Sequence, residues 1–378
     1  MKDMTRRNFL KVAGASATVA GLALAGCDNG GGTDAPAEDG GDDAAEGGSV
    51  EGMTVAFIPK VTGNAFFESA NNGAQEYAGT WGITVDYQGS PQAAVADQVE
   101  VINQAVANGA DAICISTVDA NGVSEALKAA TEAGVVVTTW DSDANPEDRT
   151  LMVSQGTPDI LADMLIEMAV AGLADRGVDA ANDPVNYCWH YSQATVTDQN
   201  SWHDAAEVKI AEQYPNWTNV HPDNYYSNQD AEQAITIGEG VLDANSDIDL
   251  IICNDSTALP GQLQAAENKG LTKDDVTITG FASPQSCVSY CENGTLYNWG
   301  LWDCAVQGAM GCYVAAYLAA GNTVKVGDTI SIPEIGDVTI EENSSIADGV
   351  ETAAENNGVV LLPERLIFTS ENMNDYDF

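Results

Sequence analysis

The sequence predicts an α/β protein made of two doubly wound parallel-sheet lobes. Short, continuous apolar runs at residues 54–59, 112–116 and 135–140 are typical of parallel strands that are buried on both faces. Segments with apolar residues at helical spacing alternate with these runs, as they do in repeated strand–helix–strand units. About 325 residues follow an acidic N-terminal stretch, which is too many for one ordinary core, so we expect two lobes.

The elements follow in a regular order. In the first half we expect strands at 54–59, 83–87, 112–116 and 135–140, separated by helices at 66–81, 95–107 and 123–132. The second half predicts helices at 158–175, 200–213, 229–243, 259–269, 284–292 and 304–320. Its strands are expected at 185–190, near Val220, and at 250–253, 276–280 and 296–301. A hairpin at 329–340 and a late strand at 359–368 end the chain. We assign residues 53–145 and 284–325 to the N-terminal lobe and residues 146–283 and 326–378 to the C-terminal lobe.

The N-terminus predicts export and lipid anchoring. Residues 5–11 (TRRNFLK) form a twin-arginine export signal, and the apolar run after it is too short to span a bilayer permanently. The run ends in Leu24-Ala25-Gly26-Cys27, a lipobox whose cysteine is lipidated. We therefore expect a signal peptide at 1–26, lipidation of Cys27, and a disordered acidic tether over 27–52. This predicts a protein anchored to the outer face of the cell membrane, on the periplasmic side where an outer membrane is present.

Charge excludes one class of function. Removing residues 1–26 leaves nine basic and 56 acidic residues, a net charge of −47. Such a chain lacks the basic patches that bind nucleic acid, and anionic lipids would repel it, so we expect membrane attachment through the lipid anchor only. Seven cysteines remain beyond Cys27, and we expect no required disulfide framework. We expect a monomer.

Polar side chains follow the predicted strands at the edge where ligands bind in open α/β sheets. Lys60 is the only cation of the mature chain before Lys128, and we expect it to point into the crevice between the lobes while contributing little to the core. The alternative is a solvated surface lysine. The other candidates at strand ends are Asp141, Asp198, Gln199, Asn254 and Ser256, with Phe66, Phe67, Trp302 and Asp303 as secondary contacts.

These residue types favour a small polyhydroxy ligand. A carboxylate accepts two hydroxyl hydrogen bonds at once, which suits a vicinal diol, although Asp141 and Asp198 would alternatively cap helices. Aromatic faces would cover the ligand's apolar edges. Signals for an enzyme are weak: the three histidines lack metal spacing, and no nucleophile or phosphate-binding motif occurs. We therefore expect no catalytic residues, metal or cofactor; acid–base chemistry by Asp141 and Asp143 is the alternative.

Several segments carry a family resemblance. Residues 55–60, 139–143, 155–158, 195–200, 300–303, 361–368 and 375–378 resemble the autoinducer-2-binding members of the ribose-binding-type solute receptors of ABC importers. The resemblance spans residues 53–378 in order. It implies a type I periplasmic-binding-protein fold, with two lobes joined by three crossovers. It also implies a cyclic hydrated form of autoinducer-2, a furanose-like polyol, in the cleft.

The resemblance also assigns ligand residues and partners. The family's ligand lysine falls on Lys60, its first aspartate on Asp141, and its Asp-Gln pair on Asp198 and Gln199. A proline and an alanine of the family are replaced here by Asn254 and Ser256. An ABC permease and ATPase are the implied partners. A receptor for rhamnose, ribose or a similar sugar, and a sensory module coupled to signalling, remain the alternatives.

Overall fold

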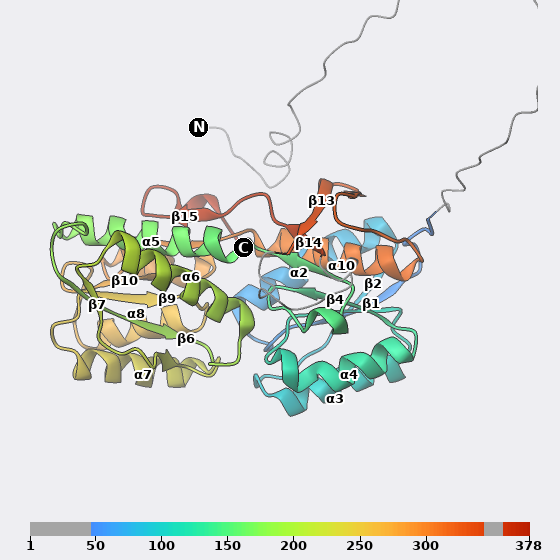
Figure 1. Ribbon diagram of the computed structural model, residues 1–378, viewed down its shortest axis with the longest axis horizontal. Coiled ribbons are helices and arrows are strands. Elements are labelled where there is room, and N and C mark those ends of the chain that lie inside the picture. The colour runs from blue at the N-terminus through green and yellow to red at the C-terminus, as the bar shows by residue number, and fades with distance from the viewer. Residues whose placement is uncertain (1–46, 344–357) are drawn as a thin grey trace, which may run out of the picture.

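The computed structural model describes residues 47–343 and 358–378, which form two lobes side by side (Figure 1). The predicted signal peptide, Cys27 and the tether up to residue 46 lie outside the described residues. Within the described ranges, no helix combines the length and apolar character needed to cross a membrane.

The first lobe is built on an eight-stranded sheet in the order β12-β13-β14-β5-β4-β3-β1-β2. The six strands from β14 to β2 are parallel, and the hairpin β12–β13 adds two antiparallel strands at one edge. The strands are β1 (Thr54–Ile58), β2 (Thr84–Tyr87), β3 (Ala112–Ile115), β4 (Val136–Trp140), β5 (Leu151–Ser154), β12 (Thr329–Ile332), β13 (Gly336–Glu342) and β14 (Gly358–Leu361).

Helices cover both faces of this sheet. α2 (Ala65–Trp81) and α10 (Cys304–Ala319) pack together on one face, and α3 (Val95–Ala107) and α4 (Ala120–Glu132) pack on the other. Asn64 caps α2 by accepting a hydrogen bond from the Phe66 amide at 2.9 Å. Glycines bring α2 and α10 close, since a Cβ on Gly73 would lie 2.0 Å from the Ala305 carbonyl oxygen.

The second lobe has a smaller parallel sheet in the order β10-β9-β6-β7, with β8 paired to β6. α5 and α6 lie on one side of it and α7 and α8 on the other (Figure 1). The strands are β6 (Val185–Tyr191), β7 (Trp217–Asn219), β8 (Tyr225–Tyr226), β9 (Leu250–Cys253) and β10 (Thr277–Gly280). The helices are α5 (Pro158–Asp175), α6 (Thr197–Gln213), α7 (Ala231–Ala244), α8 (Ala258–Asn268) and α9 (Pro284–Glu292).

Three crossovers join the lobes, as the resemblance implied. Residues 155–157 lead from β5 to α5, residues 302–303 lead from β11 (Trp299–Leu301) to α10, and residues 362–365 lead from β14 to β15 (Leu366–Phe368). β11 and β15 pair antiparallel beside the second lobe, and Gly300 bridges to Phe281 just after β10. The predicted fold class, two parallel-sheet lobes joined by three crossovers, is confirmed.

The lobe boundaries differ from the expected ones. β5 was not predicted as a strand; it pairs with β4, and β12–β14 extend the same sheet, so residues 151–154, 329–342 and 358–361 belong to the first lobe. α9, assigned to the first lobe, packs on α8 in the second. The predicted strand 359–368 is two strands, because the chain changes lobes at Pro363, which has no N–H for a ladder. β5 escaped prediction because a 3₁₀ turn, and not a helix, precedes it.

Candidate ligand-binding site

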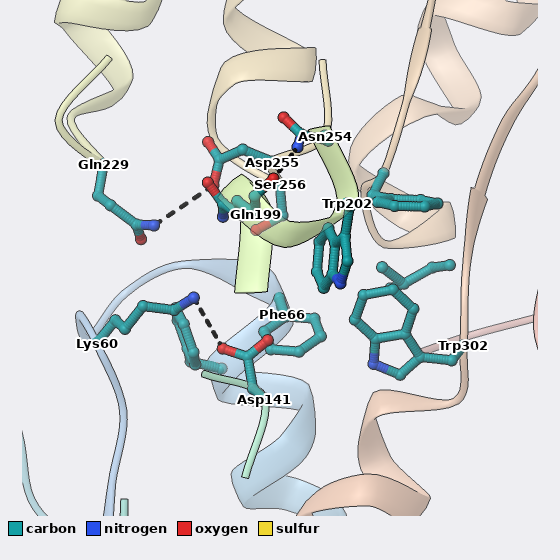
Figure 2. A pocket seen from close by; sticks show the side chains of 13 residues that line it. Lys60, Phe66, Asp141, Gln199, Trp202, Gln229, Asn254, Asp255, Ser256 and Trp302 are labelled. Atoms are coloured by element: carbon teal, nitrogen blue, oxygen red, sulfur yellow. Dashed lines mark hydrogen bonds and ion pairs between the residues drawn. The ribbon is translucent and has the colours of Figure 1, made fainter. Parts of the chain in front are cut away.

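A pocket lies between the lobes, at the carboxyl ends of the strands of both sheets (Figure 2). It contains about 320 Å³ of space free of protein atoms, part of it open to solvent. Its walls are Lys60, Phe66, Phe67, Asp141, Gln199, Trp202, Gln229, Asn254, Asp255, Ser256, Phe281, Leu301 and Trp302.

Lys60 occupies the centre of the charged side. It follows β1, and its Nζ lies 3.0 Å from Asp141 Oδ2 and 3.6 Å from Asp198 Oδ2, while it donates to Ser142 Oγ at 2.9 Å. Only 4% of the residue is exposed, so it is not a solvated surface lysine. Burial opposes the ammonium charge, but the nearby carboxylates outweigh it and raise the pKa of Lys60, so the side chain stays charged.

Asp141 caps no helix; it follows β4 in the left-handed backbone region with φ of 58°. A non-glycine residue adopts this conformation only when its surroundings hold it there. The Asp141 amide donates to the Val153 carbonyl at 3.3 Å, and Ser116 Oγ donates to Asp141 Oδ2 at 2.7 Å. The strand end thus aims the carboxylate at Lys60.

Asp198 belongs to the other lobe, in the first turn of α6. The Ser142 hydroxyl donates to its Oδ1, so Ser142 and Lys60 both tie the first lobe to Asp198. Burial raises the pKa of Asp198 to about 6, with a further rise from Asp141 and an opposing effect from Lys60. Among the residues that the structure describes, Asp198 Oδ2 receives no hydrogen bond.

The amide of Gln199 is held in one orientation. Its Oε1 accepts from the Ser192 amide at 3.2 Å and from the Ser192 hydroxyl, and its Nε2 donates to Asp255 Oδ2 at 3.2 Å. Asp255 is fixed in turn, because its Oδ1 accepts from the amides of Thr257 and Ala258 at the start of α8. Burial raises the pKa of Asp255.

Asn254 and Ser256 stand on the second-lobe wall (Figure 2). Asn254 Nδ2 donates to the Gln199 carbonyl at 2.9 Å, while the buried Asn254 Oδ1 has no partner within the described ranges. Ser256 Oγ donates to Asn64 Oδ1 at 3.4 Å, and Asn64 Nδ2 donates to Thr257 Oγ1 at 3.0 Å. These two contacts join Asn64, the N-cap of α2 in the first lobe, to the second lobe.

Aromatic rings form the apolar side. Trp302 packs edge-on against Phe66, Trp202 and Phe281, with ring centroids 5.8, 5.9 and 5.5 Å apart. Phe67 also lines the pocket. Asp303, expected as a secondary contact, is not on the wall; its Oδ1 accepts from the Val306 amide at 3.0 Å and caps α10.

Of the six residues predicted to bind the ligand, the structure places Lys60, Asp141, Gln199, Asn254 and Ser256 on the pocket wall. Asp198 is not on the wall; its Oδ2 lies 3.6 Å from Lys60 Nζ. Sequence reasoning missed Trp202, Gln229, Asp255, Phe281 and Leu301. Asp255 stands between two predicted residues, and Trp202 follows Gln199 by one helical turn, so the sequence positions of both indicated that they would lie near the site. Gln229 carried none: it lies before α7 with φ of 59°.

Other chemistries find less support. Among residues 47–343 and 358–378, no group of three or more His, Cys, Asp or Glu side chains is placed to hold a metal ion. Asp143 does not pair with Asp141 for acid–base work; Arg149 holds it through Nε at 2.9 Å and Nη2 at 2.7 Å. The seven cysteines of these ranges are free thiols, six of them buried.

A two-lobed fold with a polar cleft defines a class of binding protein, and comparison with known families agrees. Residues 55–323 match the family model described as periplasmic binding protein domain. The chain therefore belongs to the periplasmic binding protein family, whose members bind solutes outside the cytoplasm.

Three similar proteins show which kinds of solute-binding protein this chain resembles. The structure of LsrB from Clostridium saccharobutylicum in complex with AI-2 is 63% identical, with a TM-score of 0.85, and covers 86% of this chain and 100% of that one. The ribose import binding protein RbsB of Bacillus subtilis (strain 168) is 24% identical over 238 residues, 62% of this chain and 71% of the relative. The structure of a solute-binding protein from Clostridium phytofermentas with bound L-rhamnose is 22% identical, with a TM-score of 0.74. The match covers 85% of this chain and 97% of that one, and the two proteins share the fold.

Proposed function

We propose that this protein is an extracytoplasmic receptor that binds autoinducer-2 in the interlobe pocket and delivers it to an ABC importer. One observation carries the proposal. A buried lysine at the pocket joins carboxylates from both lobes, and two buried acceptor oxygens beside the pocket receive no hydrogen bond from the described residues. The 63% identity to LsrB, solved with AI-2, supports the choice of ligand.

The polar groups suit a neutral polyol. Asp198 Oδ2 and Asn254 Oδ1 are buried acceptors that receive no hydrogen bond within the described ranges. Buried acceptors are normally satisfied, and the hydroxyl groups of a cyclic hydrated diketone would supply the donors. Three carboxylates surround one ammonium, an arrangement that disfavours anionic ligands such as sugar phosphates.

Each lobe contributes part of the site. We assign Lys60 and Asp141 of the first lobe, and Asp198, Gln199, Asn254 and Ser256 of the second, to the ligand's hydroxyl groups. Phe66, Phe67 and Trp302 would cover its apolar edges. A ligand that touches both lobes at once favours the closed state over the open one, and this difference drives closure. No step of this function requires a covalent change.

Location and partners complete the proposal. We infer that Cys27 is lipidated after removal of residues 1–26, and that residues 27–52 tether a monomeric receptor near a permease and its ATPase. The order of the twin-arginine signal and the lipobox supports this. Replacement Cys27→Ser should release the exported protein from membranes into the soluble fraction; continued membrane association would contradict the anchor.

Calorimetry tests the ligand. We expect the purified protein to bind autoinducer-2 at least about tenfold more tightly than ribose or rhamnose. Lys60→Ala should abolish binding, whereas Lys209→Ala, which removes a surface lysine that also pairs with two aspartates, should leave it unchanged. No binding of autoinducer-2, with tight binding of a pentose or deoxyhexose, would establish the second candidate, a sugar receptor.

That second candidate has an observation in its favour. Asn254 and Ser256 are more polar than the family residues that they replace, and Asn254 Oδ1 offers a free acceptor among the described residues. A sensory role uses the same closed form. Cells that lack the permease but still respond to autoinducer-2 through this receptor would favour signalling over transport.

A further inference from the structure

The three crossovers are linked through one buried residue, Gln155, of which 1% is exposed. Gln155 directly follows β5 in the first crossover. Its backbone carbonyl accepts from Arg365 Nη1 of the third crossover at 2.9 Å. Its side-chain Oε1 accepts from Gln307 Nε2 at 2.9 Å, and its Nε2 donates to the Asp141 carbonyl at 3.3 Å.

Gln307 continues these contacts to the second crossover. It is fully buried in α10, and its Oε1 accepts from Trp302 Nε1 at 2.7 Å. Trp302 and Asp141 both line the pocket, on its aromatic and its charged side (Figure 2). A continuous series of hydrogen bonds, Trp302–Gln307–Gln155–Asp141, therefore runs from one side of the pocket to the other through the hinge. We call these four residues the hinge network.

The third crossover is tied to the same point. The Leu362 amide donates to the Ser154 carbonyl at 2.9 Å, and Arg365 Nη1 donates to the Leu362 carbonyl at 2.8 Å as well as to Gln155. Crossover residues are the ones whose backbone angles change when lobes open and close. Gln155 thus contacts the third crossover through its backbone carbonyl, and its side chain reaches the second crossover through Gln307.

Core packing alone does not require this arrangement. Apolar side chains of similar size would fill the same space, whereas buried amides must find partners at every position. The network ends on Asp141, whose left-handed backbone aims its carboxylate at Lys60. We propose that Gln155 is a positioning residue that couples the pocket walls to the angle between the lobes.

This proposal rests on the proposed function for the presence of a ligand in the pocket, but one of its readouts needs no ligand. The variants are Gln155→Leu, Gln307→Leu and the double variant. The matched control is Gln262→Leu, a fully buried glutamine of α8 that contacts His190 and the Gly238 carbonyl, away from pocket and crossovers.

Two measurements separate coupling from plain stability. We expect each network variant to raise the Kd for autoinducer-2 by about tenfold, the effect of one or two lost hydrogen bonds. In small-angle scattering, the ligand-free variants should give a radius of gyration different from that of the wild type. Since the two glutamines act as one unit, the double variant should bind no more weakly than the weaker single variant. Gln262→Leu should lower Tm with Kd and radius unchanged.

Several results would overturn the proposal. A Gln155→Leu protein that loses Tm as the control does, with Kd and radius of gyration unchanged, would make Gln155 purely structural. If the increases in Kd of the two single variants multiply in the double variant, Gln155 and Gln307 act independently, which contradicts the proposal. If Gln155→Leu does not fold, Gln155→Glu replaces it; this variant keeps the acceptor for Gln307 and loses the donor to Asp141, and normal binding by it also refutes the coupling. Failure of wild-type protein to bind any polyol would refute the proposed function, while the scattering comparison still tests the hinge.

Discussion

Replacing Lys60 by methionine should destabilise the protein severely. A lysine at a strand end was expected to contribute little to the core, but the structure buries it, with 4% exposed, between carboxylates of two lobes. Removing one partner of a buried ion pair leaves an uncompensated charge and costs about 3–5 kcal/mol. Lys60→Met keeps most of the side chain's volume, so that cost is electrostatic.

The loss should depend on pH through Asp198. Its pKa is about 6 in the folded protein against an ordinary value of 3.8, and this difference corresponds to about 3 kcal/mol. The stability linked to this raised pKa is fully present below the unfolded value and is lost as pH rises through the folded one. Without Lys60 the pKa of Asp198 in the folded protein rises further. The stability of the variant therefore continues to fall at pH values where the stability of the wild type has levelled off. At pH 5 both proteins hold a protonated Asp198, and the difference between them shrinks.

Urea unfolding followed by tryptophan fluorescence at pH 5 and pH 8 measures both effects. Lys209→Met is the matched control, because Lys209 also pairs with two aspartates, at 3.3 and 2.7 Å, but at the surface. We expect the control to cost at most about 1 kcal/mol at either pH. The reasoning is refuted if Lys60→Met costs no more than Lys209→Met at pH 8, or if its cost is equal at the two pH values.

Three further predictions concern packing and the thiols. Gly73→Ala should lower the free energy of unfolding by about 1–3 kcal/mol, because its Cβ would meet the Ala305 carbonyl. The Cβ of Gly79→Ala, in the same helix, meets nothing within 4 Å, so this variant should be more stable by up to about 1 kcal/mol. Thermal melts distinguish the two variants. Gly280→Ala, with φ of 153° and a Cβ 1.7 Å from the Cys253 carbonyl oxygen, should prevent soluble expression, and a normal yield would contradict the geometry. Cys291 is half-buried and should be the first of the seven thiols between residues 47 and 343 that a maleimide labels in native protein, as peptide mass spectrometry can check.

Local patterns predicted most elements of the fold. The helices expected at 158–175 and 284–292 coincide with α5 and α9, because helical periodicity and a flanking Pro158 or Pro284 mark their starts. The strand-end rule correctly predicted that Lys60, Asp141 and Gln199 share one pocket and that Asp198 lies beside Lys60, since parallel strands present their carboxyl ends at the same edge.

What escaped prediction depends on pairing between distant segments. β5 follows a 3₁₀ turn and not a helix, so it breaks the strand–helix alternation, and it joins the first sheet through its pairing with β4 and β14. The burial of Lys60 arises because Asp198 of the other lobe closes over it, and no local pattern records that contact. Gln155 shows its role only when the three crossovers are seen together.

The charges of the site also bear on when the lobes close. In the closed form Asp198 is buried with one oxygen lacking a donor among the described residues, which costs free energy that an open, hydrated Asp198 does not incur. Under the proposed function, a ligand hydroxyl that donates to Asp198 would remove this cost in the closed form only, and so would shift the population toward closure. A proton on Asp198, whose pKa is about 6, would remove part of the same cost without ligand. Ligand-free protein should therefore be more compact in small-angle scattering at pH 5 than at pH 8. Asp198→Asn should abolish that difference, and an equal difference in the variant would assign it to other groups.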